Sequence, residues 1–186
     1  SPTEPASPPE PLSPTEPMSP ARPEPAEPTA RASQAPGAGV RGVYADIKVT
    51  PEQAYDLFKG LYPTAQVKQL ELDLQDHAYY AYEVEGYEGN TEYEVKIDAL
   101  DARILKQEQG RHDGSGGEVL RADLARIPEL ITAALQDAGA GFSVKDWEAA
   151  VKRGRVVFQV ELLGQGGREI EYQFDLQTGD LLQKDV

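Results

Sequence analysis

The chain has 186 residues, a formal net charge of −14 and no cysteine. The negative charge argues against binding to nucleic acid or to an anionic membrane surface, because both need a positively charged footprint, and it favours a basic protein, a peptide or a cation as partner. Without cysteine there can be no disulfide, no thiolate nucleophile and no cysteine-based metal site.

Residues 1–40 are predicted to be a disordered tail or stalk rich in proline, glutamate and serine. Of the 15 prolines, 12 lie within the first 36 residues, where large apolar side chains are scarce. Such a segment cannot bury enough apolar surface to offset its chain entropy, and it favours polyproline II conformations. At roughly 3.1 Å per residue it would reach on the order of 100 Å, which suits a spacer. A ligand for SH3-like domains is the rival interpretation, which the acidic flanks disfavour.

The start of the chain and its proline-rich tail predict an exported protein. The chain begins at Ser1 without a methionine or a signal peptide, and it has no apolar segment long enough to cross a bilayer. A leader removed by processing, followed by a proline-rich spacer, is typical of such proteins; trimming of the chain is the alternative. We therefore expect an extracytoplasmic location, secreted or tethered to the cell envelope, with a lipid anchor at a processed N-terminus as one means of tethering.

Everything after the tail consists of two copies of one pattern, 77 residues apart. Pro51 and Pro128 hold equivalent places, each at the beginning of an amphipathic helical pattern. Thr50 and Gln53 predict a capping box at the start of the first helix. The apolar face of the helix is expected to consist of Ala54, Leu57, Phe58 and Leu61 in the first copy and of Ile131, Ala134 and Leu135 in the second.

Three segments of alternating apolar and polar residues follow each helix and predict three strands. The inward residues are expected to be Leu70, Leu72, Leu74, Tyr80, Tyr82, Val84, Tyr93, Val95 and Ile97 in the first copy, and Trp147, Ala149, Val151, Val156, Phe158, Val160, Ile170, Tyr172 and Phe174 in the second. Each copy then ends in a tight turn and a short fourth strand. Gly179 suits the second turn, and Ala102 takes the equivalent place in the first.

These patterns predict an α+β fold of two tandem modules, each with one helix packed on a small antiparallel sheet of three to four strands. The first module is expected to span residues 44–109 and the second 118–186, with a glycine-rich joint at 110–117 between them. Because the joint contains Gly114, Gly116 and Gly117, we expect it to be flexible.

The closing segments of the two copies resemble the PepSY domain. The sequence YEVKIDALDARIL at residues 93–105 and YQFDLQTGDLL at residues 172–182 both carry the D-x-x-[TD]-[GA]-x-[IL]-L element of that family. The resemblance covers residues 45–109 and 118–186. It implies a bacterial secreted or lipid-anchored protein without catalytic residues, similar to modules proposed to inhibit or regulate peptidases.

Residues able to perform chemistry are few. His77 and His112 could act as bases near neutral pH, but both are expected in turns, where a solvated histidine is the simpler interpretation. Ser115 lies near His112 and Asp113, yet a flexible glycine-rich joint cannot hold a catalytic triad in place. Acidic residues at the closing turns are explained by turn capping rather than by a calcium loop. We therefore expect no enzyme, no cofactor and no metal site.

The polar positions of the strands predict an acidic sheet face in the first module, relieved mainly by Lys96. Its carboxylates are Glu71, Asp73, Glu83, Glu85, Glu92 and Glu94. This face is either solvated surface that keeps the protein soluble or a binding surface for basic groups.

The function that these observations favour is that of a non-catalytic extracytoplasmic binding module. Its partner would be an exported protein or a peptidase with a basic surface, bound through the acidic face. The alternative is a cell-envelope scaffold or sensor domain presented on a proline-rich stalk. The sequence does not determine the oligomeric state.

Overall fold

The computed structural model describes residues 44–114 and 116–186, so the predicted tail lies outside the described residues. The first half of the fold consists of a 3₁₀ turn η1 (Tyr44–Asp46), helix α1 (Pro51–Leu61) and strands β1 (Gln66–Gln75), β2 (Tyr79–Glu88), β3 (Thr91–Asp98) and β4 (Ile104–Arg111). The second half consists of η2 (Asp123–Arg126), α2 (Ile127–Ala138), β5 (Ser143–Lys152), β6 (Arg155–Leu163), η3 (Gln165–Gly167), β7 (Glu169–Asp175) and β8 (Leu181–Asp185). Each half thus contains one helix followed by four strands.

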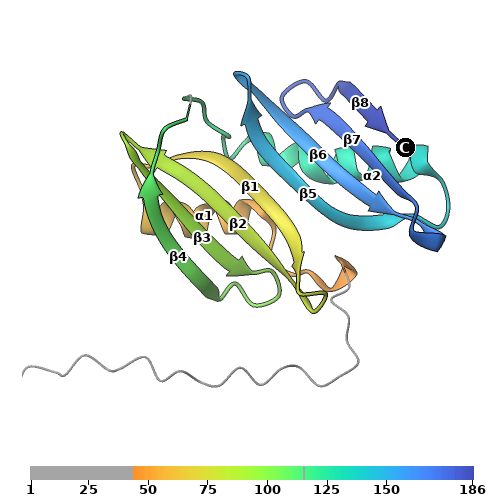
Figure 1. Cartoon of the computed structure of the whole chain (residues 1–186), viewed down its shortest axis with the longest axis horizontal. Helices are drawn as coiled ribbons and strands as arrows, with labels where there is room; N and C mark the ends of the chain where they lie inside the picture. The colour runs from red at the N-terminus through yellow and green to blue at the C-terminus, as the bar shows by residue number, and fades with distance from the viewer. Residues whose placement is uncertain (1–43, 115) are drawn as a thin grey trace, which may run out of the picture. The chain divides into compact units, whose positions relative to one another are not determined.

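The prediction of two tandem modules with separate small sheets is wrong. All eight strands belong to one antiparallel sheet in the order β4-β3-β2-β1-β5-β6-β7-β8 (Figure 1). The halves join where β1 pairs with β5, through Gln69 with Ala150, Leu70 with Ala149, Glu71 with Glu148 and Leu72 with Trp147. We call this four-residue ladder the seam.

The seam has a simple physical origin. In a separate module, the first strand would be an edge strand, with a row of unpaired backbone N–H and C=O groups. Pairing β1 with β5 satisfies these groups and leaves β4 and β8 as the edges. Alternation within each strand predicts which residues point inward but carries no information on which strands of the two copies pair.

Both helices pack on the same face of this sheet (Figure 1). The capping box predicted for α1 is confirmed: Gln53 N donates to Thr50 Oγ1 at 3.2 Å, and Thr50 N donates to Gln53 Oε1 at 2.9 Å. Phe58 from α1 and Ile127 from α2 enter a single hydrophobic core that runs under the seam. Trp147, only 2 % exposed, is a core residue as predicted.

The closing turns follow the predicted chemistry. Asp98 Oδ1 accepts hydrogen bonds from the backbone N–H groups of Leu100 and Asp101, and Asp175 Oδ1 does the same for the equivalent turn of the second half. Ala102 has a positive φ of 63°, at the place where Gly179 has 85°. The first turn therefore holds a left-handed alanine, which costs more than glycine there.

Across the part of the chain that the structure describes, neither helix is long and apolar enough to cross a membrane.

We predict that Tyr82→Ala and Phe158→Ala each lower the free energy of unfolding by about 3 kcal/mol or more, because both side chains are fully buried and their removal leaves a cavity. Chemical denaturation monitored by circular dichroism would measure the change. Tyr79→Ala is the matched control, since Tyr79 lies on the same strand as Tyr82 but is 37 % exposed. Equal losses for Tyr79 and Tyr82 would contradict the assigned core.

Candidate functional site on the acidic face of the sheet

The six predicted carboxylates lie together on the sheet face opposite the helices. Alternation puts this face outward because Leu70, Tyr82 and Val95 occupy the core. β1 supplies Glu71 and Asp73, β2 supplies Glu83 and Glu85, and β3 supplies Glu92 and Glu94. Glu71 lies directly opposite Glu83, and Glu85 directly opposite Glu94. All six are only partly exposed, so neighbouring side chains limit their contact with water.

Lysines compensate a large part of this charge. Lys68 Nζ bridges Glu85 Oε2 at 2.8 Å and Glu92 Oε2 at 2.7 Å. Lys96 Nζ lies 3.0 Å from Glu83 Oε2. Two of these three lysine contacts were not anticipated, because Lys68 precedes the regular alternation: a break in the β1–β2 register between Val67 and Gln69 turns it onto this face.

Glu71 stands apart from the other carboxylates of the face. Its side chain accepts a hydrogen bond from Gln69 Nε2 at 3.2 Å, and its charged neighbours are Glu83, Asp73 and Glu148. Burial of the carboxyl group, followed by repulsion from these three acids, raises the pKa of Glu71 from 4.5 to about 7. Glu71 is therefore partly protonated at neutral pH.

The acidic face continues across the seam into the second half. Glu148 on β5 lies opposite Glu71, and Glu161 on β6 lies opposite Glu171 on β7. Burial, and then the charge of Glu161, raises the pKa of Asp146 to about 6. Sequence analysis did not include Asp146 and Glu148, because their place beside the first half's acids depends on the pairing of β1 with β5.

Three of the carboxylates approach closely enough to suggest a cation site. One carboxylate oxygen each from Glu83, Glu85 and Glu94 lies within 4.8 Å of the others. Lys96 and Lys68 already pair with the first two, and Lys106 Nζ lies 3.6 Å from Glu94 Oε1. Since ammonium groups neutralise all three acids, the arrangement does not favour a metal.

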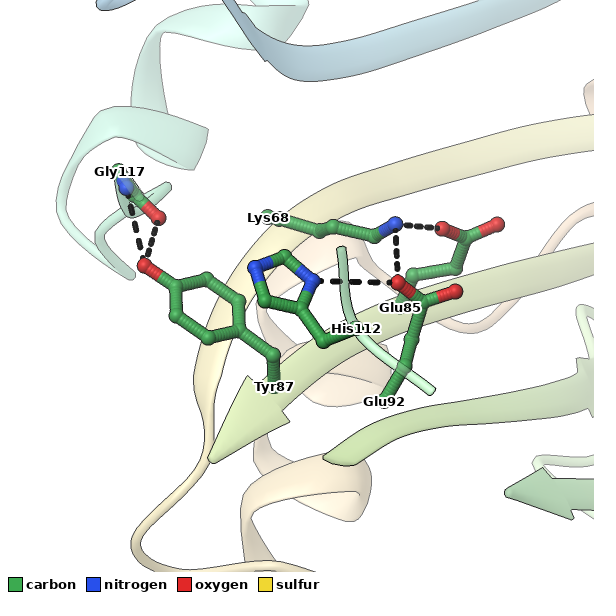
Figure 2. A network of polar contacts seen from close by, with 6 residues as sticks. All are labelled: Lys68, Glu85, Tyr87, Glu92, His112 and Gly117. Carbon is green, nitrogen blue, oxygen red and sulfur yellow. Dashed lines mark hydrogen bonds and ion pairs between the residues drawn. The ribbon is translucent and has the colours of Figure 1, made fainter. Parts of the chain in front are cut away.

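A polar network attaches the connection between the halves to one end of this face (Figure 2). The ring of His112 stacks on Tyr87 with centroids 4.1 Å apart, and His112 Nδ1 lies 3.3 Å from Glu92 Oε2. The Tyr87 hydroxyl accepts a hydrogen bond from Gly117 N at 2.9 Å and donates one to Gly117 O at 3.1 Å. Lys68 links this network to Glu85.

The expectation of two solvated turn histidines is therefore half wrong. His77 is exposed in the β1–β2 turn, as predicted, whereas His112 is only 9 % exposed. The burial of His112 depends on the aromatic face of Tyr87 and on Glu92. Sequence could not place Tyr87, because it lies near the end of β2, on the outward face. The alternation of apolar and polar residues in β2 gives no reason to expect that a residue from the segment between the two halves stacks on Tyr87.

Residues 48–108 match a family described as PepSY, the peptidase propeptide and YPEB domain. The predicted resemblance is thereby confirmed for this segment, which lies within the first half of the fold.

A candidate lipoprotein from Clostridium difficile 630, known from a crystal structure, has a similar fold. It is 23 % identical in sequence, with a TM-score of 0.59, and the match covers 75 % of this chain and 93 % of that protein. This similarity extends well beyond residues 48–108 and establishes the fold. A search of curated proteins finds no match.

We predict that His112→Asn lowers the free energy of unfolding by about 1 to 2 kcal/mol, because it removes the aromatic stack on Tyr87 from a buried position. His77→Asn is the control, since His77 is exposed and asparagine tolerates its positive φ of 55°. Urea denaturation of both variants measures the difference. Equal stability of the two variants would mean that the network does not anchor the connection.

Proposed function

We propose that this chain is a non-catalytic, extracytoplasmic binding module whose acidic face binds a basic segment of another exported protein. The observation that carries the proposal is an open sheet surface that neither helix covers (Figure 1). Acids outnumber lysines at the outward positions of its strands in both halves. Complementary charge of this kind accelerates association and selects partners of opposite sign.

Peptidases are the partner class that the family favours. The PepSY match carries the description of a peptidase propeptide, a segment of chain that accompanies an enzyme. We propose that the module regulates a peptidase by occupying a basic surface next to its active site. The face contains no group arranged as a nucleophile and base among the described residues, which fits a binding role.

The structural neighbour favours a second candidate function, that of a cell-envelope scaffold or sensor. Its description as a candidate lipoprotein supports a place at the cell envelope, where a proline-rich tail could act as a stalk. In that case the folded part would be a scaffold or sensor, and its partners would be envelope components rather than peptidases.

We predict that removing four charges from the acidic face weakens binding of the partner by about tenfold or more. It should also abolish most of the salt dependence of the association rate. The variant carries the substitutions Asp73→Asn, Glu83→Gln, Glu94→Gln and Glu108→Gln; Glu108 of β4 lies directly opposite Glu94 on the same face. It retains Glu85 and Glu92, so that Lys68 keeps its ion pairs. The unmodified chain, immobilised, would first capture partners from a cell-envelope extract. Binding kinetics of the purified partner would then be measured at several salt concentrations.

The control removes the same charge from exposed positions elsewhere, through Asp46→Asn, Glu88→Gln, Asp113→Asn and Glu129→Gln. The proposal fails if both variants bind alike. Capture of a peptidase in stoichiometric amounts supports regulation, and capture of wall or membrane machinery supports the scaffold.

A further inference from the structure

The seam between β1 and β5 contains an unusual row of like charges. Glu71 on β1 lies opposite Glu83 on β2 and, on its other side, opposite Glu148 on β5. Three carboxylates thus follow one another across three adjacent strands. Like charges directly opposite on neighbouring strands destabilise a sheet, and partial burial strengthens their repulsion.

Within residues 44–114 and 116–186, the outer members of this row have cations as partners and the central one does not. Glu83 pairs with Lys96 of β3, and Glu148 pairs with Lys152 of its own strand. Among the described side chains, Glu71 receives only the amide of Gln69, and Asp73 adds a further negative charge from β1. A proton on Glu71 is the simplest way to relieve this repulsion.

A second acidic group lies at the same boundary. Asp146 on β5 lies opposite Glu161 of β6, and the charges of Asp73 of β1 and Glu169 of β7 also raise its pKa. Lys145 is the cation beside it, but its ammonium bonds Glu161 at 2.8 Å and Glu169 at 3.0 Å. Acids of β1 and β5 therefore repel one another at two places where the halves meet, Glu71 with Glu148 and Asp73 with Asp146.

We propose that the seam is linked to protonation: a proton on Glu71 tightens the pairing of β1 with β5, and ionisation of Glu71 loosens that pairing. This effect is separate from the binding function proposed above, because it concerns contacts within the chain. It makes the coupling between the two halves depend on the pH of the surroundings.

The direction of the effect follows from the raised pKa of Glu71. The folded state holds the proton up to a pH of about 7, whereas the unfolded chain releases it near 4.5. Stability from this group is complete below the lower value and is lost as the pH rises through the interval between them. Asp146 acts in the same direction, since its pKa is raised from 3.8 to about 6.

Loosening should stay local, because other contacts also join the halves. The Tyr80 hydroxyl donates to Lys145 O at 2.7 Å, and Arg121 forms two hydrogen bonds to Asp56 at 2.7 and 2.8 Å. We therefore expect greater opening of the four ladder positions rather than separation of the halves.

The single tryptophan of the chain is a probe at the seam itself. Trp147 pairs with Leu72 in the ladder and packs edge-on against Tyr82, with ring centroids 6.0 Å apart. Acrylamide quenching of its fluorescence in the full chain should increase between about pH 5 and pH 8. Over the same range, amide hydrogen-exchange protection at residues 69–72 and 147–150 should fall about tenfold, whereas protection in β6 and β7 should change less.

Glu71→Gln distinguishes the effect of Glu71 at the seam from a general effect of pH on the protein. The substitution keeps the shape of the side chain and removes its titration. Above about pH 6, where Asp146 has already lost its proton, both signals should therefore lose most of their pH dependence and stay near the tight, low-pH level. Glu171→Gln, on the same face and opposite Glu161, is the control and should behave like the unmodified chain. The inference is overturned if the unmodified chain shows no pH dependence at the seam, or if Glu71→Gln retains it.

Discussion

The backbone pairing of β1 with β5 is the contact on which the rest of this structure depends. It converts two four-stranded segments into one sheet and places the apolar residues of both halves in a single core. It also creates one continuous outer face from strands that belong to different halves. Sheets of three or more strands with a covered apolar face are stable, and the larger sheet leaves fewer exposed edges per strand.

The outer face shows how a small sheet can carry many acids. Five lysines each contact at least one carboxylate of this face: Lys68, Lys96, Lys106, Lys145 and Lys152. Such exposed or half-exposed pairs contribute little stability individually, but they limit the repulsion that the acids would otherwise exert. The network around His112 adds a structural role, because it attaches the connection between the halves to the end of the first half.

Sequence reasoning recovered the local structure and missed the long-range pairing. The capping box at Thr50, the inward position of Trp147 and the left-handed Ala102 all depend on residues close in the chain, where residue type and spacing decide the conformation. The seam depends on backbone groups that every residue except proline has, so no residue type identifies it.

The candidate site was likewise predicted where it depends on residues close in the chain and missed where it depends on the pairing of β1 with β5. The six carboxylates of the first half followed from alternation alone, whereas Glu148 and Asp146 joined them only through the seam. The connection was expected to be flexible because it is rich in glycine. Gly117 lies with a φ of 145° against Val151, where a Cβ atom would approach the side chain to 2.5 Å. The missing Cβ atom of this glycine permits the close packing, a role that composition alone does not reveal.

The register of the seam has a consequence that follows from its symmetry. Glu71 and Glu148 are the same position in the two copies, and they lie opposite each other, so the ladder has the form of an isologous contact with a pseudo-twofold axis between them. Every other position of the ladder faces a different position of the repeat, and opposite charges could be placed there in both copies at once. On the axis a residue meets its own counterpart. A carboxylate at that position must therefore face a carboxylate for as long as the two halves carry the same residue there. The repulsion can then be relieved by a proton or a nearby cation, or removed by a different residue in one half.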